Sequence, residues 1–214
     1  MLDVNKLFVK ICGITRAQDA ELAAGLGATA IGFVFWPNSP RYLTLDAAKA
    51  IVSTVGASVL KVGVFVDQPV DEVAGIMNQA ELDVAQLHGH ETPEYCRQLI
   101  EKCSRSGTTV IKAVGMKENG AVKIDAFDPG VLVLVDAYDA ARFGGTGKVV
   151  NWDAAREIAT TRRTILAGGL NAANIKLAIR SVRPYGIDVS SGVESSPGVK
   201  DPNRLRTFFE ALHD

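Results

Sequence analysis

The sequence is poor in the residue types that mark several common classes of protein. Its 214 residues include only three cysteines and three histidines. Three cysteines do not make the paired framework of a small secreted domain. His88 and His90 could share one face, but a hydrolytic metal site would also need carboxylates that the spacing does not single out. We therefore expect no disulfide framework and no bound metal.

Charge and hydropathy argue against two further kinds of partner. The formal net charge is -1, and the lysines and arginines are scattered rather than gathered in a stripe, so we expect no binding of nucleic acid or of a membrane surface. No apolar run reaches the length of a membrane span, and residues 1–6 lack the start of a signal peptide. We expect a cytoplasmic protein, a monomer, whose partner is a small molecule.

Short apolar segments alternate with helical patterns along the whole chain, and no linker or low-complexity tract divides it. The segments are nearly continuous in Val, Ile, Leu, Ala and Phe, which is typical of parallel strands covered on both faces. We predict eight strands, at residues 7–12, 30–36, 60–66, 84–87, 109–114, 131–136, 164–167 and 186–190. Capping residues predict helix starts at Thr15 (with Gln18), Thr44, Thr92, Asn171 and Asp201.

Eight strand and helix pairs fit one architecture well. Dividing 214 residues by eight leaves about 27 per unit, enough for a strand, a helix and two short loops. We therefore predict an α/β protein, a (β/α)8 TIM barrel that forms a single domain over residues 1–214. The alternative is a doubly wound open sheet. That fold normally carries a G-x-G-x-x-G fingerprint after its first strand, and residues 12–15 do not match this motif.

Two residues at predicted strand ends carry candidate acid and base chemistry. Cys12 ends the first strand, and the carboxyl ends of barrel strands are where active sites form, so its thiol is a candidate base or nucleophile. Asp136 follows five apolar residues, and partial burial there would help it to hold a proton as a general acid. The alternatives are that Cys12 is a small buried hydrophobe and that Asp136 caps the next loop.

The loops after the seventh and eighth strands predict a phosphate site. They carry Gly168 and Gly169 in one loop, and Asp188, Ser190, Ser191 and Gly192 in the other. Barrels often bind phosphate at this position through loop N–H groups and the start of a short helix. A phosphorylated substrate is implied, although glycines in tight turns would look the same.

Three further loops contribute candidate polar groups. Arg41 lies just after Pro40, and its planar guanidinium suits a carboxylate. His88 follows the fourth strand and is expected to be a polar lining residue. Residues 144–148, Gly-Gly-Thr-Gly-Lys, do not make a P-loop, because Arg142 stands where the first glycine belongs and Val149 where Ser or Thr should follow the lysine. We interpret residues 138–148 as a loop that could act as a lid.

Several of these stretches, in this order, carry a family resemblance over essentially the whole chain. The chain resembles the phosphoribosylanthranilate isomerases of tryptophan biosynthesis. The matching stretches are residues 10–15 (KICGIT), 32–35 (GFVF), 40–42 (PRY), 62–66 (VGVFV), 86–89 (QLHG), 135–136 (VD), 144–148 (GGTGK), 167–170 (AGGL) and 188–194 (DVSSGVE).

The resemblance implies a reaction and roles for the site residues. The reaction is a cofactor-free Amadori rearrangement of an aminoaldose to an aminoketose. Cys12 would be the general base, Asp136 the general acid, and Arg41 the ligand of the anthranilate carboxylate. Residues 138–143 match no motif. Lys10 lies two residues before Cys12 and could project to the same face, so we expect it to favour the Cys12 thiolate.

Two other interpretations remain open from the sequence. One is another phosphosugar aldose-ketose isomerase barrel, such as the enzyme of histidine biosynthesis, which would be expected to carry an aspartate where Cys12 stands. The other is a non-catalytic phosphosugar-binding protein or a thiol redox sensor. A sensor needs a second cysteine nearby, but Cys96 and Cys103 fall in a predicted outer helix.

Overall fold

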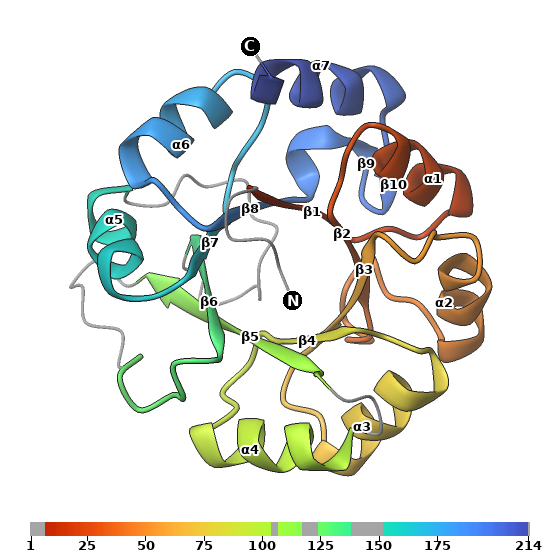
Figure 1. Cartoon of the computed structure of the whole chain (residues 1–214). Coiled ribbons are helices and arrows are strands. Elements are labelled where there is room, and N and C mark those ends of the chain that lie inside the picture. The colour runs from red at the N-terminus through yellow and green to blue at the C-terminus, as the bar shows by residue number, and fades with distance from the viewer. Residues whose placement is uncertain (1–6, 104–106, 117–123, 138–151, 214) are drawn as a thin grey trace.

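The computed structural model describes residues 7–103, 107–116, 124–137 and 152–213. Eight parallel strands close into a barrel in the order β1 to β8, and helices surround it (Figure 1). The strands are β1 (Phe8–Cys12), β2 (Ala30–Val34), β3 (Leu60–Phe65), β4 (Val84–Leu87), β5 (Thr109–Met116), β6 (Leu132–Ala137), β7 (Thr164–Leu166) and β8 (Gly186–Val189). The predicted (β/α)8 barrel is confirmed, with every predicted strand present.

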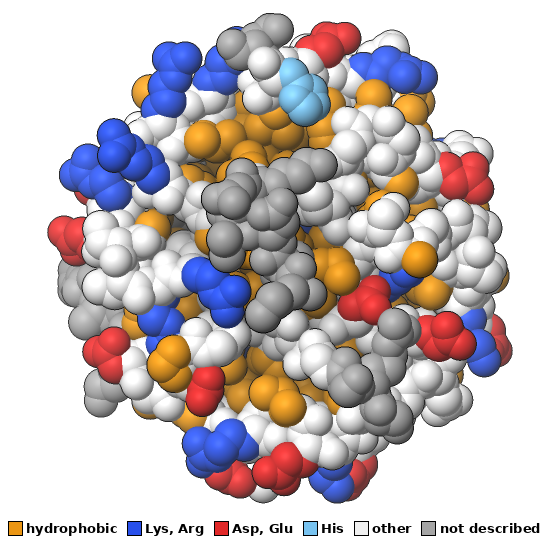
Figure 2. All heavy atoms as spheres, in the orientation of Figure 1, with side chains coloured by type: hydrophobic (Ala, Val, Ile, Leu, Met, Phe, Trp, Pro, Cys, Tyr) orange, Lys and Arg blue, Asp and Glu red, His pale blue; other side chains and the backbone are white. Residues whose placement is uncertain are grey.

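A helix follows each strand except β5 in the described part of the chain, and residues 117–123 after β5 lie outside it. The helices are α1 (Ala17–Gly25), α2 (Leu45–Val52), α3 (Val70–Gln79), α4 (Pro93–Lys102), α5 (Trp152–Thr161), α6 (Ile175–Val182) and α7 (Pro202–His213). None of the described helices is long and apolar enough to cross a membrane. The face of the molecule in Figure 2 carries acidic and basic side chains interspersed around its rim.

The continuous apolar character of the strands follows from burial on two sides. One cluster fills the barrel interior and includes Phe8, Val62, Ile111 and Leu132. A larger cluster lies between the strands and the helices, and it includes Ile11, the neighbour of Lys10 on the opposite face of β1. Because successive strand residues point to opposite faces, both sets must be apolar. The barrel closes where β1 pairs with β8, with Lys10 beside Asp188.

Three of the predicted helix starts are confirmed. The side chains of Thr44 and Thr92 accept hydrogen bonds from the backbone N–H groups of Ala47 and Tyr95 at the starts of α2 and α4. Asp201 accepts from two backbone N–H groups in the first turn of α7. Short polar side chains at these positions satisfy donors that the first helical turn leaves unpaired.

Two predicted helix starts are wrong, and each of these residues uses its side chain elsewhere. α1 begins at Ala17, after Arg16, and the Thr15 hydroxyl donates to the Gly198 carbonyl instead. α6 begins at Ile175, because Asn171 closes a separate turn by accepting from the Ala173 N–H. Cys96 lies in α4 as predicted, but Cys103 follows the last residue of that helix.

A small addition after β8 was not predicted. A single 3-10 turn, η1 (Ser191–Val193), leads into an antiparallel hairpin of β9 (Glu194–Ser196) and β10 (Val199–Lys200). Gly198 has a φ of 81°, which the tight turn between the two strands requires. The hairpin lies beside α1 (Figure 1), and the Lys200 N–H donates to the buried carboxylate of Asp19 in that helix.

Candidate active site

A cavity of about 760 Å³ opens at the carboxyl ends of the barrel strands. All ten residues predicted for the site line it: Cys12, Arg41, His88, Asp136, Gly168, Gly169, Asp188, Ser190, Ser191 and Gly192. They come from six different strand ends or following loops. The predicted lid, residues 138–148, lies outside the described residues.

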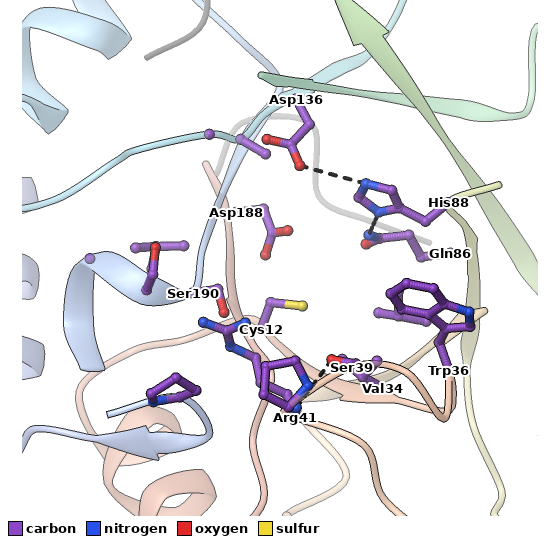
Figure 3. Close-up of a pocket in the computed structure, with 18 of the residues that line it drawn as sticks. Cys12, Val34, Trp36, Ser39, Arg41, Gln86, His88, Asp136, Asp188 and Ser190 are labelled. Atoms are coloured by element: carbon purple, nitrogen blue, oxygen red, sulfur yellow. Dashed lines mark hydrogen bonds and ion pairs between the residues drawn. The ribbon is translucent and has the colours of Figure 1, made fainter. Parts of the chain in front are cut away.

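Cys12 and Asp136 face the same space from β1 and β6. Figure 3 shows the Cys12 sulfur and the Asp136 carboxyl directed into the cavity, with Asp188 between them in this view. Both residues are buried, at 9% and 8% exposure. Gly32 on β2 leaves room for the thiol, since a Cβ there would lie 3.0 Å from the Cys12 sulfur. The arrangement presents a thiol and a carboxyl to one bound molecule.

Lys10 is a fully buried cation that contacts two of the lining residues, Asp188 and Gln86. Its Nζ lies 3.1 Å from Asp188 Oδ1 and donates to Gln86 Oε1 at 2.8 Å. Burial alone would lower the pKa of Lys10, but Asp188 and Cys12 outweigh it and raise the pKa above its ordinary value. Lys10 therefore carries a positive charge beside the thiol, as the sequence predicts from the spacing of the two residues.

The pKa of the Cys12 thiol is raised above its ordinary value. Burial is the largest cause, and the charge of Asp188 acts in the same direction. Lys10 and Lys200 lower the pKa of Cys12, and the Lys10 contribution has the direction that we expected, but these cations do not overcome burial. In the ligand-free protein the thiol is therefore the dominant form at neutral pH, and the thiolate is the minor form.

Polar contacts run from Asp136 to His88, which follows β4, and from His88 to Gln86 in β4. His88 Nε2 lies 3.5 Å from Asp136 Oδ2. On the other side of the ring, His88 Nδ1 lies 3.0 Å from the side-chain nitrogen of Gln86 (Figure 3). His88 therefore stands between the candidate acid and the interior of the barrel.

Arg41 is held in the cavity wall by a carboxylate. Its Nε and Nη2 donate to the two oxygens of Glu194 at 2.9 and 2.6 Å. This bidentate pairing is the main reason that the pKa of Arg41 lies above its ordinary value. Gly13 makes the placement possible, because a Cβ at Gly13 would lie 2.3 Å from Arg41 Cδ.

Glu194 and Lys200 form a buried ion pair that contacts the lining residues Arg41 and Cys12. Lys200 Nζ lies 2.8 Å from Glu194 Oε1 and donates to the Cys12 carbonyl at 2.6 Å. Burial alone would raise the pKa of Glu194, but Arg41 and Lys200 outweigh it, and the pKa lies below its ordinary value. For Lys200 burial prevails and lowers the pKa. The pair joins the end of β1 to the β9 and β10 hairpin.

The two loops predicted to bind phosphate lie against each other. Gly168 and Gly169 both have positive φ values, 85° and 66°, which favour glycine. A Cβ at Gly192 would lie 1.9 Å from the Leu170 carbonyl oxygen, so only glycine allows this approach. The loops therefore present closely spaced backbone and the hydroxyls of Ser190 and Ser191 to the cavity.

Sequence reasoning missed three polar residues of the site or its support. Gln86 had a usable signal, because it is a polar residue inside an apolar strand and lies two positions before His88 on the same face. Glu194 lies in a matched motif, but nothing in the sequence pairs it with Arg41. Lys200 follows a turn and looks like a surface lysine. In the described residues no group of three or more His, Cys, Asp or Glu side chains could hold a metal ion.

The comparisons with known proteins lead to one family. The family model for N-(5'-phosphoribosyl)anthranilate (PRA) isomerase matches residues 9–211. The N-(5'-phosphoribosyl)anthranilate isomerase of Desulforudis audaxviator is 43% identical over 208 residues, which cover 96% of this chain and 98% of that protein. The one from Syntrophus aciditrophicus is 41% identical over 206 residues, with 95% and 86% covered.

Solved structures show the same likeness. The phosphoribosyl anthranilate isomerase of Thermus thermophilus has a TM-score of 0.86 and 42% identity, with 97% of this chain and 98% of that chain covered. A phosphoribosyl anthranilate isomerase in complex with reduced 1-(o-carboxyphenylamino)-1-deoxyribulose 5-phosphate has a TM-score of 0.84 and 34% identity, with 97% and 99% covered. On its sequence, its barrel and the match along nearly its whole length, the chain belongs to the N-(5'-phosphoribosyl)anthranilate isomerase family.

Proposed function

We propose that Cys12 and Asp136 are the general base and general acid of the isomerisation for which the family is named. In this reaction N-(5'-phosphoribosyl)anthranilate becomes 1-(o-carboxyphenylamino)-1-deoxyribulose 5-phosphate, a step of tryptophan biosynthesis. The observation that carries the proposal is the placement of a buried thiol and a buried carboxyl, from β1 and β6, around one cavity. An aldose becomes a ketose by proton transfers alone, so an acid and a base at separate atoms suffice.

The proton transfers follow from the two groups. Protonated Asp136 donates to the ribose ring oxygen, and the ring opens to a Schiff base. The Cys12 thiolate then removes the proton from sugar C2, and the resulting enolamine tautomerises to the ketone. After one turnover Cys12 carries the proton and Asp136 has lost one, so exchange with solvent resets the pair. Cys12 forms no covalent bond with the substrate in this scheme.

The charges around Cys12 support its role as a base. A thiol with a raised pKa is a stronger base once it is ionised, and Lys10 offers its thiolate a buried counter-charge. Cys12 and Asp136 react in protonation states opposite to those of an ordinary thiol and an ordinary carboxyl at neutral pH, because the reaction needs a thiolate and a protonated carboxyl together. A small population of that form is used at each turnover.

The other predicted site residues have proposed roles in binding. Arg41 binds the anthranilate carboxylate through the part of its guanidinium that Glu194 leaves available. Backbone N–H groups and hydroxyls of the two glycine-bearing loops bind the phosphate, at Gly168, Gly169, Ser190, Ser191 and Gly192. His88 and Asp188 provide polar contacts to the sugar between these ends. No cofactor takes part.

Two isosteric variants test the acid and base roles. Cys12→Ser and Asp136→Asn should each lower kcat/KM by about 10²- to 10⁴-fold, the usual contribution of general acid–base catalysis. Both should still bind the reduced product analogue, since binding uses other groups. The fluorescence change of phosphoribosylanthranilate measures turnover, and titration with the analogue measures binding.

Cys96→Ser is the matched control, because Cys96 is a buried thiol in α4, away from the cavity. Its turnover should equal that of the wild type. Binding of the substrate without turnover by the wild-type protein would support the non-catalytic alternative and would refute the assignment. Full activity in either Cys12→Ser or Asp136→Asn would remove that residue from its role.

A further inference from the structure

A line of polar contacts joins the Cys12 side of the cavity to the Asp136 side. Lys10 Nζ donates to Gln86 Oε1, Gln86 Nε2 contacts His88 Nδ1, and His88 Nε2 lies 3.5 Å from Asp136 Oδ2. Lys10 and Gln86 are 0% and 1% exposed. The contacts run from β1 through β4 to β6, and Figure 3 shows those from Gln86 through His88 to Asp136.

The chemistry of these groups fixes the direction of each hydrogen bond. An ammonium group can only donate, so the Gln86 side chain must turn its oxygen to Lys10. Its NH₂ group then faces His88, and an amide nitrogen can only donate as well. His88 Nδ1 must therefore accept with its lone pair. In the neutral imidazole the proton then sits on Nε2, on the side of Asp136.

We propose that Gln86 is a positioning residue for the isomerisation, which holds His88 in the tautomer with its proton on Nε2, facing Asp136. Gln86 does so because Lys10 fixes the orientation of its amide. The proposal rests on the proposed role of Asp136 as the general acid, and it adds His88 and Gln86 to the residues that support that acid.

The tautomer matters because His88 lies beside the group that must deliver a proton. With the proton on Nε2, the imidazole cannot accept the proton of Asp136 at that atom, so the proton remains available for the ribose ring oxygen. Once Asp136 has given it up, the Nε2–H faces the new carboxylate and favours its charge. With the opposite tautomer, the bare Nε2 lone pair would take the proton from Asp136 and the acid would be lost.

Nitrogen-15 NMR of the histidine side chains tests the proposal without any assay of activity. The chain has three histidines, and a His88→Asn variant identifies the signals of His88. In the ligand-free wild type at neutral pH, we expect a neutral ring with its proton on Nε2. A ring protonated on Nδ1 alone, or a doubly protonated ring, would overturn the proposal. This result is independent of whether Cys12 and Asp136 are the base and acid.

Two variants then connect the tautomer to the reaction. Gln86→Glu replaces the donor by an acceptor of the same shape, so the His88 proton should move to Nδ1. Gln86→Met removes the donor without adding a charge, and the preference for one tautomer should disappear. In both variants kcat should fall about 10- to 100-fold, part of what a general acid contributes, while KM changes by less than about threefold.

Gln98→Glu, on the exposed surface of α4, is the matched control and should change neither the spectrum nor kcat. A kcat within about twofold of the wild type in a folded Gln86 variant whose tautomer has changed would contradict the proposal. So would an unchanged tautomer in Gln86→Glu. If both variants fail to fold, the wild-type spectrum alone decides between the two tautomers.

Discussion

The charge on Lys10 is the main electrostatic support for a thiolate at Cys12. Lys10 is fully buried, so water screens its charge little, and Asp188 helps to keep it protonated. The spacing of the two residues predicted this neighbourhood, because alternate residues of a strand share a face. Burial of the thiol itself could not be read from the sequence, and it is the larger influence on the pKa of Cys12.

Lys10→Met should raise the pKa of Cys12 further. The variant removes the nearest positive charge and leaves burial and Asp188, which both favour the thiol. The rate of alkylation of Cys12 against pH, in a background with Cys96→Ser and Cys103→Ser, measures the thiolate. We expect the alkylation curve of Cys12 to lie at higher pH in Lys10→Met than in the protein that retains Lys10. A curve that does not move would show that Lys10 has no influence on the thiolate.

Arg41→Met should weaken substrate binding more than it slows the chemical step. It removes the guanidinium that we assign to the anthranilate carboxylate, and a charged hydrogen-bonded pair contributes on the order of 2 kcal/mol, or about 30-fold in KM. Steady-state kinetics separate KM from kcat. Arg204→Met is the control, because Arg204 bonds the Glu194 carbonyl and does not line the cavity. Unchanged KM in Arg41→Met would remove Arg41 from the binding site.

Among the secondary-structure elements, the strands were predictable and the hairpin was not. The strands could be read from sequence because each is apolar on two faces, so the apolar runs are unbroken. The helix starts at Thr15 and Asn171 failed because each side chain has a partner outside its helix. β9 and β10 are three and two residues long, too short to show a periodic pattern.

Lys200→Met should destabilise the barrel through this hairpin. Lys200 holds Glu194 and the carbonyls of Cys12 and Ser190. Its loss leaves a buried carboxylate whose charged partner among the described residues is Arg41 alone. The free energy of unfolding should fall by on the order of 3 kcal/mol, the lower end of the cost of breaking a buried ion pair, because Arg41 still pairs with Glu194. Urea denaturation measures the change.

Lys49→Met, on the exposed surface of α2, is the control and should change the free energy of unfolding by less than about 0.5 kcal/mol. A loss below about 1 kcal/mol in Lys200→Met would show that the Lys200 and Glu194 pair is not a significant support of the hairpin.

For the whole molecule, the fold and the position of the site were predictable together. Once eight strands are recognised, barrel topology places Cys12, Asp136 and the glycine-bearing loops at one end. The sequence could not show how Gln86 connects Lys10 to His88, because that contact joins residues 76 positions apart. The expected monomer, the cytoplasmic location and the extent of a single domain over residues 1–214 stay predictions.

The central claim is that catalysis needs a Cys12 thiolate and a protonated Asp136 at the same time. As pH rises, the thiolate becomes more abundant and the protonated carboxyl less abundant, so the two trends oppose each other in the wild type. In Asp136→Asn only the thiolate trend remains. Because burial raises the pKa of Cys12 above its ordinary value, that trend should extend well above neutral pH.

The pH dependence of kcat/KM for Asp136→Asn, measured beside the wild type, is therefore the most direct test. We predict that the wild-type value changes little across neutral pH. The residual value of Asp136→Asn should rise about tenfold per pH unit up to the pKa of Cys12. A residual activity in Asp136→Asn that is independent of pH, or that falls as pH rises, would contradict the assignment of base and acid.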